Sequence, residues 1–158
     1  MIIGIVAVDR NLAIGKGGTL PWHYSADMRF FKQTTSGNAV VMGHRTWETL
    51  KKPLPDRLNI VLTTKEDMPP VNSVVRLPGL SLVLTLANTL TADVFIIGGG
   101  KVYETFLPYI DRWIVTEIPL SVDGADTFVP ANFLDGFELY EVRQLDTNLR
   151  AKFYDRSY

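Results

Sequence analysis

Residues 95–104 read Phe95-Ile96-Ile97-Gly98-Gly99-Gly100-Lys101-Val102-Tyr103-Glu104. A short apolar run that ends in glycines and continues into a helix-forming sequence is typical of a buried strand that turns into a helix. The free N–H groups at such a turn can hold a phosphate, and glycine lets the phosphate approach the backbone. Taken alone, the motif fits a strand-to-helix turn without a ligand equally well.

The triplet differs from the standard dinucleotide-binding fingerprint. That fingerprint would place glycine at the position of Tyr103, and it normally follows the first strand of a nucleotide-binding domain. Only about sixty of the 158 residues follow Gly98, which is too few for a full doubly wound domain. The motif therefore does not by itself identify a dinucleotide-binding domain.

Strand-like and helix-like segments alternate along most of the chain. Ile2–Val8 is a continuous β-branched run, as expected for a strand covered on both faces. Ser25–Thr35 is predicted to be a helix with Ser25 as its N-cap, and residues 11–18 a loop. Further strands are predicted at residues 39–42, 59–62, 73–76, 94–97 and 113–118, further helices at 45–50, 80–90 and 102–107, and a terminal hairpin from 137–142 and 152–158. The predicted fold class is α/β, with a mainly parallel sheet and an antiparallel edge.

Composition narrows the possible functions. The chain of 158 residues fits one domain, 1–158, and its 46% hydrophobic and 21% charged residues are ordinary for a globular protein. A net charge of −1 gives no reason to expect nucleic acid or an anionic membrane as a partner. With no cysteine and two histidines, the sequence predicts no disulfide and no metal centre. The apolar N-terminal run is short and lacks a basic leader, so we expect a cytoplasmic protein.

Asp27 is the acidic residue of most interest. It lies in the first turn of a predicted helix, where an exposed acid that stabilises the helix dipole is the ordinary interpretation. Apolar residues flank it, with Trp22 before it and Met28 and Phe31 after it, and Phe31 lies on the same helical face. Apolar surroundings disfavour the ionised form of an acid, which then needs a partner. A flat ligand with two N–H donors would satisfy the carboxylate, with Phe31 packed on its ring.

Cations and hydroxyls follow two of the predicted strands. Met42-Gly43-His44-Arg45-Thr46 begins a helix, and Leu62-Thr63-Thr64-Lys65 follows another strand. Each set is either a solvated surface or an anion site, and after neighbouring parallel strands the two would form one anion-binding rim. Arg57, after the rigid Pro53-Leu54-Pro55 segment, is either a solvated charge or a fork for a ligand carboxylate. Lys16-Gly17-Gly18 is either a turn or the hinge of a lid.

Several motifs occur in a fixed order along the chain: Ile14-Gly15, Leu20-Pro21-Trp22, Asp27, Phe31-Lys32, Gly43-His44-Arg45-Thr46-Trp47-Glu48, Pro53-Leu54-Pro55-Asp56-Arg57, residues 97–104 and Asp126-Thr127. This ordered set, which extends over the whole chain, resembles the dihydrofolate reductases. The resemblance implies a central eight-stranded sheet, mainly parallel with an antiparallel C-terminal edge strand, flanked by four helices. It also implies a cleft in which dihydrofolate and NADPH meet.

The resemblance further implies roles for individual residues. Asp27, Trp22 and Leu20 would form the catalytic set, with Thr116 supporting Asp27, and Leu20 would lie on a lid that the loop of Asp126 steadies. The other substrate-binding residues would be Ile5, Val6, Ala7, Met28, Phe31, Lys32, Leu50, Leu54, Arg57, Ile97, Tyr103 and Thr116. The residues around NADPH would be Ala7, Ile14, Gly15, Gly43, His44, Arg45, Thr46, Leu62, Thr63, Thr64, Lys65, Gly98, Gly99, Gly100, Lys101, Val102 and Tyr103.

Tyr24 and Ser25 replace a commoner leucine–proline pair, which should matter little, and two further departures from the family pattern bear on ligand binding. Family members commonly carry arginine where His44 stands, beside the 2′-phosphate of the adenosine, so less charge is available here to select NADPH over NADH, and Lys65 is the candidate to compensate. Asp56 replaces the usual glycine between proline and arginine, and an acid beside Arg57 is expected to weaken its hold on the glutamate α-carboxylate of folate.

The implied reaction is the NADPH-dependent reduction of 7,8-dihydrofolate to 5,6,7,8-tetrahydrofolate, by hydride transfer to C6 and protonation of N5, in a monomer that serves one-carbon metabolism. Asp27 would anchor the pterin, and water beneath Leu20 and Trp22 would deliver the proton. Two alternatives remain open. One is a pterin-independent reductase on the same fold, such as the pyrimidine reductase of the riboflavin pathway. The other is a non-catalytic protein that binds NADPH or folate.

Overall fold

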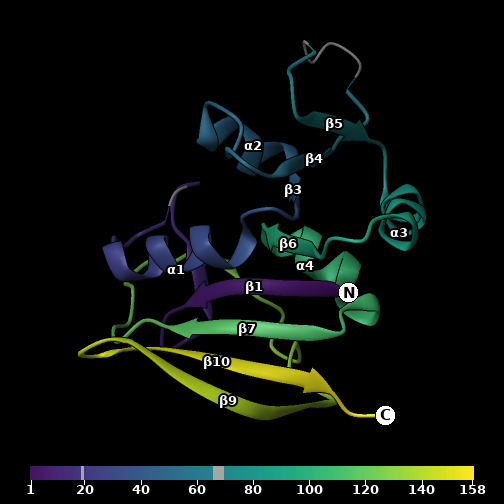
Figure 1. Ribbon diagram of the computed structural model, residues 1–158. Coiled ribbons are helices and arrows are strands. Elements are labelled where there is room, and N and C mark those ends of the chain that lie inside the picture. Colours follow the sequence, from purple (N-terminus) through teal and green to yellow (C-terminus); the bar gives the residue numbers. More distant parts are fainter. Residues whose placement is uncertain (19, 66–69) are drawn as a thin grey trace.

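The computed structural model describes residues 1–18, 20–65 and 70–158. Its main sheet has eight strands in the order β5-β4-β3-β6-β1-β7-β10-β9 (Figure 1). These strands are β1 (Ile2–Val8), β3 (Ala39–Gly43), β4 (Leu58–Leu62), β5 (Val74–Leu77), β6 (Val94–Gly98), β7 (Arg112–Glu117), β9 (Phe137–Asp146) and β10 (Leu149–Arg156). The neighbours from β5 to β7 pair in parallel, whereas β10 pairs antiparallel with β7 and with the edge strand β9. The predicted fold class is confirmed.

Helices cover both faces of this sheet. The helices are α1 (Ser25–Thr35), α2 (His44–Leu50), α3 (Leu80–Thr89), α4 (Gly100–Phe106) and the short 3-10 helix η1 (Leu107–Tyr109). Phe30 of α1 is buried in a cluster on one face, where Trp47 of α2 also packs. Val83 of α3 and Phe106 of α4 are buried in the cluster on the other face. Because β1 is covered on both sides, it is apolar along its whole length.

Two local predictions are wrong. Ser25 is not the N-cap of α1, because Tyr24 has the extended backbone of the cap position and Ser25 is already helical. Residues 11–18 are not all loop, because β2 (Ala13–Gly15) pairs with β8 (Thr127–Phe128) in a second, two-stranded sheet. Strands this short carry almost no alternation of apolar and polar residues, so their pairing partner rather than their own sequence determines them.

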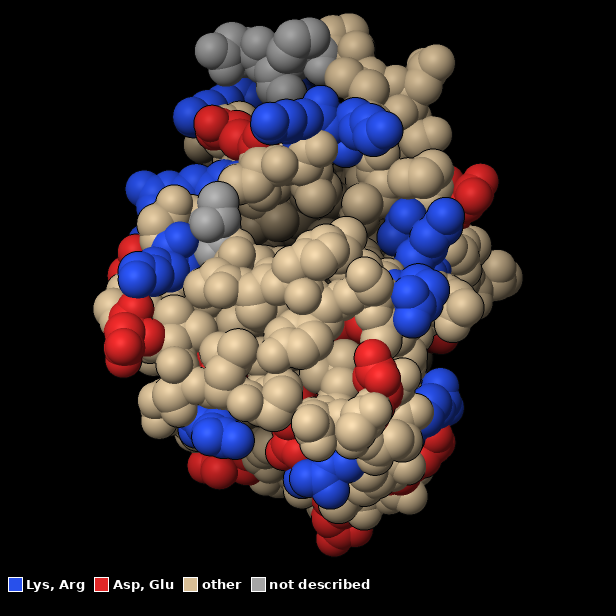
Figure 2. Space-filling model, turned by 90° about the vertical axis from the view of Figure 1, so that its left-hand side faces the viewer, with Lys and Arg blue, Asp and Glu red and all other residues tan. Residues whose placement is uncertain are grey.

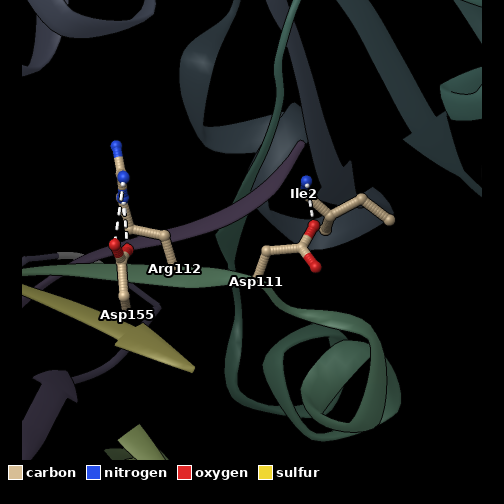
Figure 3. Close-up of polar contacts among 4 residues, drawn as sticks. All are labelled: Ile2, Asp111, Arg112 and Asp155. Atoms are coloured by element: carbon tan, nitrogen blue, oxygen red, sulfur yellow. Dashed lines mark hydrogen bonds and ion pairs between the residues drawn. The ribbon is translucent and has the colours of Figure 1, made fainter. Parts of the chain in front are cut away.

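Charged side chains form hydrogen bonds that link neighbouring strands near the amino ends of β1 and β7. The carboxylate of Asp111, just before β7, accepts a hydrogen bond from the backbone N–H of Ile2 at 2.9 Å. Arg112 of β7 donates from Nε and Nη2 to the two carboxylate oxygens of Asp155 in β10, at 2.6 and 3.2 Å (Figure 3). Arg112 and Asp155 form an ion pair, whereas Asp111 accepts a neutral N–H, and all of these contacts lie at the end of the sheet away from the carboxyl ends of the parallel strands.

Candidate active site

Many of the predicted site residues lie where the parallel strands end, whereas Arg57 precedes β4 and lies at the other end of that strand. Ala7 lies beside Thr116 in the register of β1 and β7, and Gly43 lies beside Leu62 in the register of β3 and β4. Gly98 ends β6, which pairs with both β1 and β3. Figure 2 shows a hollow on this face, with Lys and Arg side chains around its upper rim. Parallel α/β sheets bind their ligands at this end of the strands.

Asp27 lies in the first turn of α1, as predicted, and is largely buried. Burial raises the pKa of its carboxyl above the ordinary value, and a polar interaction with the Thr116 hydroxyl offsets only part of that rise. Nearby Trp22 packs with Ala7 beside Ala26, and its buried Nε1 has no hydrogen-bond partner within residues 1–18, 20–65 and 70–158. A buried donor and an under-partnered acid indicate a place for a polar ligand or for water.

Large apolar side chains stand open beside this acid. Met28 is 56% exposed and Leu20 is 61% exposed. The sequence pattern suggested that Met28 helps to bury Asp27. The exposure of Met28 shows that other residues cover this carboxylate. Phe31, Leu50 and Leu54 pack, partly buried, against the cluster that contains Phe30. Open apolar side chains around a buried carboxylate suit a flat ligand with polar and apolar parts.

The side chains of β1 separate, because successive residues of a strand point to opposite faces. Ile5 belongs to the cluster on the α1 side, whereas Val6 belongs to the cluster on the α3 and α4 side. The two side chains therefore face opposite sides of the sheet, and their assignment to the ligand pockets stays a prediction. The Ile5 carbonyl accepts a hydrogen bond from the Tyr103 hydroxyl at 2.7 Å. Burial raises the pKa of that phenol above its ordinary value, so Tyr103 remains a neutral donor.

Arg57 is buried, not a solvated charge. Its side chain is 6% exposed, Nε donates to the Pro55 carbonyl at 2.8 Å, and Nη1 donates to the Thr35 hydroxyl at 3.0 Å. The guanidinium also lies 5.9 Å from the ring centre of Phe31. Burial lowers its pKa below the ordinary value, and the Asp56 carboxylate opposes that change. In the described part of the chain no carboxylate hydrogen-bonds Arg57, so Nη2 can receive a ligand anion.

Asp56 stands at a position that favours glycine. Its φ is 61°, in the left-handed region, and its carbonyl accepts a hydrogen bond from the Gly37 N–H at 2.8 Å. Aspartate tolerates this conformation better than most side chains. The departure from the family pattern at this position is therefore compatible with the same turn.

The glycine triplet brings two strand ends into close contact. A Cβ added at Gly43 would lie 3.2 Å from Cγ2 of Val102, and one added at Gly99 would lie 4.0 Å from the hydroxyl oxygen of Thr46. Gly98 has a φ of 118° and is joined to Gly99 by a cis peptide bond. The backbone of the triplet is thus bare toward Thr46, and the exposed cations Arg45 and Lys101 belong to the adjoining helices. This arrangement fits the pyrophosphate of a dinucleotide.

The rim beyond β3 and β4 contains a cation that the sequence pattern did not reveal. The backbone N–H of Lys65 binds the Thr63 hydroxyl at 3.0 Å, and Nη1 of Arg76 donates to the Lys65 carbonyl at 2.8 Å. Arg76 reaches this place because β5 pairs in parallel with β4, Val61 opposite Arg76. The sequence distance between the two segments concealed the contact, and only the strand order would have predicted it.

His44 begins α2 and is already partly engaged. Its Nε2 lies 2.8 Å from the Glu48 carboxylate one helical turn away. Its Nδ1 is buried and has no hydrogen-bond partner among the residues that the structure describes. His44 therefore supplies less free positive charge than an arginine would at the same place.

The segment between β2 and α1 is tied to a distant loop. The backbone N–H of Gly17 donates to the Asp126 carboxylate at 2.9 Å, and the N–H of Asp126 donates to the Gly15 carbonyl at 3.2 Å. The predicted contact between the loop of Asp126 and the lid segment is therefore present. The described residues contain no group of acidic and histidine side chains that could hold a metal ion, and none of their helices is long and apolar enough to cross a membrane.

Comparisons with known proteins show the family to which this chain belongs. The family model for dihydrofolate reductase matches residues 1–156. A dihydrofolate reductase of Bacillus subtilis is 37% identical over 129 residues, covering 78% of this chain and 73% of that protein. One from Neisseria meningitidis is 40% identical over 129 residues, covering 80% and 77%. The solved dihydrofolate reductase from Enterococcus faecalis, complexed with NADP(H) and RAB-propyl, has a TM-score of 0.89 at 31% identity and covers 99% of this chain and 96% of its own.

Proposed function

Because this chain belongs to the dihydrofolate reductase family, we propose that it reduces dihydrofolate by hydride transfer to C6 of the pterin and protonation of N5. NADPH-dependent reduction of dihydrofolate is the activity of an enzyme of this family. The observation that carries the finer proposal is the Asp27 carboxylate, which is largely buried, raised in pKa and short of partners beside an open apolar cleft. NADPH would supply the hydride from C4 of its nicotinamide.

Asp27 anchors the pterin in this proposal. The 2-amino group and N3–H of a pterin present two parallel donors, which match the two oxygens of one carboxylate. The interaction favours the protonated pterin and places C6 toward the glycine triplet. Asp27 lies on the pyrimidine side of the ring, so N5 takes its proton from water beneath Leu20 and Trp22. The unpartnered Nε1 of Trp22 suits the binding of such a water.

The benzoyl ring and the glutamate of the substrate contact the apolar side chains near Asp27 and the buried Arg57. Phe31, Leu50 and Leu54 line the apolar wall for the benzoyl ring, and the open side chain of Met28 closes over it. Arg57 binds the α-carboxylate of the glutamate through its remaining donors. Lys32, exposed one residue after Phe31, lies near enough in sequence to meet the tail of the substrate.

NADPH is held by the strand ends around the triplet. Ile14, Gly15 and Ala7 face the nicotinamide, and the backbone of Gly98–Val102, with Thr46 and Arg45, holds the pyrophosphate. Thr64, Lys65 and Arg76 hold the 2′-phosphate, in place of the arginine that His44 replaces. We also propose a single-domain monomer, located in the cytoplasm.

The direct test is a mixture of protein, NADPH and dihydrofolate, followed by the absorbance of the reduced nicotinamide. We expect its loss in step with the appearance of tetrahydrofolate. Tight binding of NADPH without any loss would contradict the proposal and favour a non-catalytic binding protein. Turnover of the pyrimidine intermediate of riboflavin synthesis, without turnover of dihydrofolate, would favour the other reductase on this fold.

A further inference from the structure

Asp9 is a buried carboxylate that the proposed reaction does not use. It follows β1 directly and is 3% exposed. Oδ1 accepts hydrogen bonds from the backbone N–H groups of Asn11 and Ala13, each at 2.8 Å, and Oδ2 accepts one from Val122, also at 2.8 Å. One side chain thus holds two segments that are more than a hundred residues apart.

The two segments are those that form the small sheet. Ala13 is the first residue of β2, which pairs with β8, and Val122 lies on the segment that leads into β8. The backbone adds to this junction: Asp9 N–H donates to the Ala13 carbonyl at 3.1 Å, and Arg10 N–H donates to the Leu120 carbonyl at 3.0 Å. The carboxylate therefore joins the first residue of β2 to the segment that precedes β8.

The small sheet lies against the proposed cofactor site on both of its strands. β2 carries Ile14 and Gly15, which the proposed function places at the nicotinamide. β8 touches the glycine triplet, because a Cβ added at Gly100 would lie 3.0 Å from the Phe128 carbonyl oxygen and 3.6 Å from Cγ2 of Thr127. Any shift of β8 would therefore move the backbone that is proposed to hold the pyrophosphate.

We propose that Asp9 is a positioning residue for NADPH: its carboxylate fixes the two-stranded sheet against the glycine triplet and so sets the affinity for the cofactor. The inference rests on the proposed function only in naming NADPH as the ligand. Asp9 does not reach the reacting atoms, and its effect passes through β2 and β8. The sites of Asp27 and Arg57 lie on other elements, so dihydrofolate affinity should depend on Asp9 much less.

The variant Asp9→Asn tests this directly. An amide offers one acceptor oxygen and a donor NH2, so at least one of the three backbone N–H groups would then face another donor. We expect the Kd for NADPH, measured by protein fluorescence, to rise about tenfold, as for the loss of one buried charged hydrogen bond, while the Kd for dihydrofolate changes less than about twofold. A purely structural role would weaken both ligands alike, or neither, whatever the change in melting temperature.

Asp111→Asn is the matched control. Asp111 also accepts a backbone N–H, from Ile2 of the same strand β1, but at the opposite end of that strand (Figure 3). The substitution Asp111→Asn should lower the stability of the protein and leave the Kd for NADPH unchanged. An equal rise of the Kd for NADPH in Asp9→Asn and Asp111→Asn, or no rise in either, would overturn the inference.

If Asp9→Asn fails to fold, amide hydrogen exchange of the unaltered protein provides a second test. On addition of NADPH, exchange at the amides of Ala13 and Val122 should slow more than exchange at Ile2. Equal slowing at all three amides would contradict the positioning role. If the unaltered protein binds no NADPH at all, the proposed function fails and this inference fails with it, whereas binding that is indifferent to Asp9 defeats the inference alone.

Discussion

Asp9 is a buried carboxylate and Asp27 a half-buried one, and they differ in how many hydrogen bonds the protein donates to their oxygens. Asp9 accepts three backbone hydrogen bonds at 2.8 Å; burial alone would raise its pKa, but these bonds bring the pKa below the ordinary value. Asp27 has the Thr116 hydroxyl as its polar neighbour, and its pKa stays above the ordinary value because of burial. The first acid is complete within the protein, and the second is incomplete without a ligand.

The same contrast separates two arginines. Arg112 shares both oxygens of Asp155, and this hydrogen-bonded pairing raises its pKa above the ordinary value. Arg57 is more deeply buried, hydrogen-bonds a carbonyl and a hydroxyl, and has a pKa below the ordinary value because of burial. Charges that serve the fold are matched by hydrogen bonds or by an opposite charge, whereas charges in the cleft retain unused hydrogen-bonding capacity. This difference distinguishes a binding group from a structural group better than residue type does.

The largest expected effect is that of Asp27→Asn on turnover. The amide cannot accept two parallel N–H donors with both of its polar atoms, and it cannot favour the protonated pterin. We expect kcat/KM for dihydrofolate at neutral pH to fall about 10²–10⁴-fold, because the charged pair that anchors the pterin and the bias toward its protonated form, on which proton transfer to N5 depends, are lost together. Turnover equal to that of the unaltered protein would remove Asp27 from the mechanism.

Arg57→Gln should have the next largest effect, and on one part of the substrate alone. Loss of a charged hydrogen bond to the glutamate should raise the KM for dihydrofolate about 10–100-fold. The KM for a dihydropterin without the glutamate should not change. The comparison of the two substrates also cancels any loss of folded protein caused by the lost bonds to Thr35 and Pro55. An equal loss for both substrates would show that Arg57 only supports the fold.

Arg76→Ala should have a smaller effect, because the side chain is exposed and solvent screens its charge. We expect the ratio of kcat/KM for NADPH to that for NADH to fall about two- to fivefold, with the activity toward NADH unchanged. Arg29→Ala, which removes an exposed arginine of α1, is the control for a general change in charge. If it lowers the ratio equally, Arg76 does not select the 2′-phosphate.

The smallest expected effect is on the pH dependence of stability. The substitutions Asp27→Asn and Asp9→Asn should change the melting temperature at neutral pH in opposite directions. The folded pKa of Asp27 lies above the ordinary value of 3.8, so the folded state holds the proton more tightly than the unfolded state does. The folded protein therefore loses stability as pH rises from 3.8 through the folded pKa. Asp27→Asn should therefore raise the melting temperature at neutral pH, by about 2–4 °C for each kcal/mol recovered, and leave it unchanged below pH 3.8.

Asp9 has the reverse linkage. Its folded pKa lies below 3.8, so its stabilising contribution is present above pH 3.8 and is lost as pH falls through the folded pKa. Asp9→Asn should lower the melting temperature at neutral pH. A shift of the same sign in both variants would remove the distinction between a matched acid and an under-matched one.

Most of the fold was predictable from the sequence, because the long strands and helices have a residue composition and spacing that indicate their secondary structure. The apolar run of β1 and the helix α1 were predicted with the observed limits. The antiparallel pairing of β2 with β8 was not predicted, since it depends on contacts such as Asp9 with Val122 that join distant segments. The polar surroundings of Asp9 are backbone N–H groups, which no side-chain pattern reveals.

The site was predicted in part for the same reason. Asp27 and Arg57 were identified through motifs, but their burial and their lack of charged partners come from packing against Thr116, Thr35 and Phe31. Arg76 was missed, because only the order of β4 and β5 brings it to Lys65. Local pattern thus names candidate residues, and the strand order decides which of them meet.

A titration of the carboxyl carbons of Asp9 and Asp27 by NMR, in the ligand-free protein, tests the central claim most directly. Both residues can be followed in the same sample, and the variants Asp9→Asn and Asp27→Asn assign the two signals. We predict that Asp9 titrates below 3.8 and Asp27 above it, and that bound dihydrofolate lowers the pKa of Asp27 while leaving that of Asp9 in place. A ligand-free Asp27 that titrates at or below 3.8 would mean that the protein already satisfies this carboxylate, and would contradict the account.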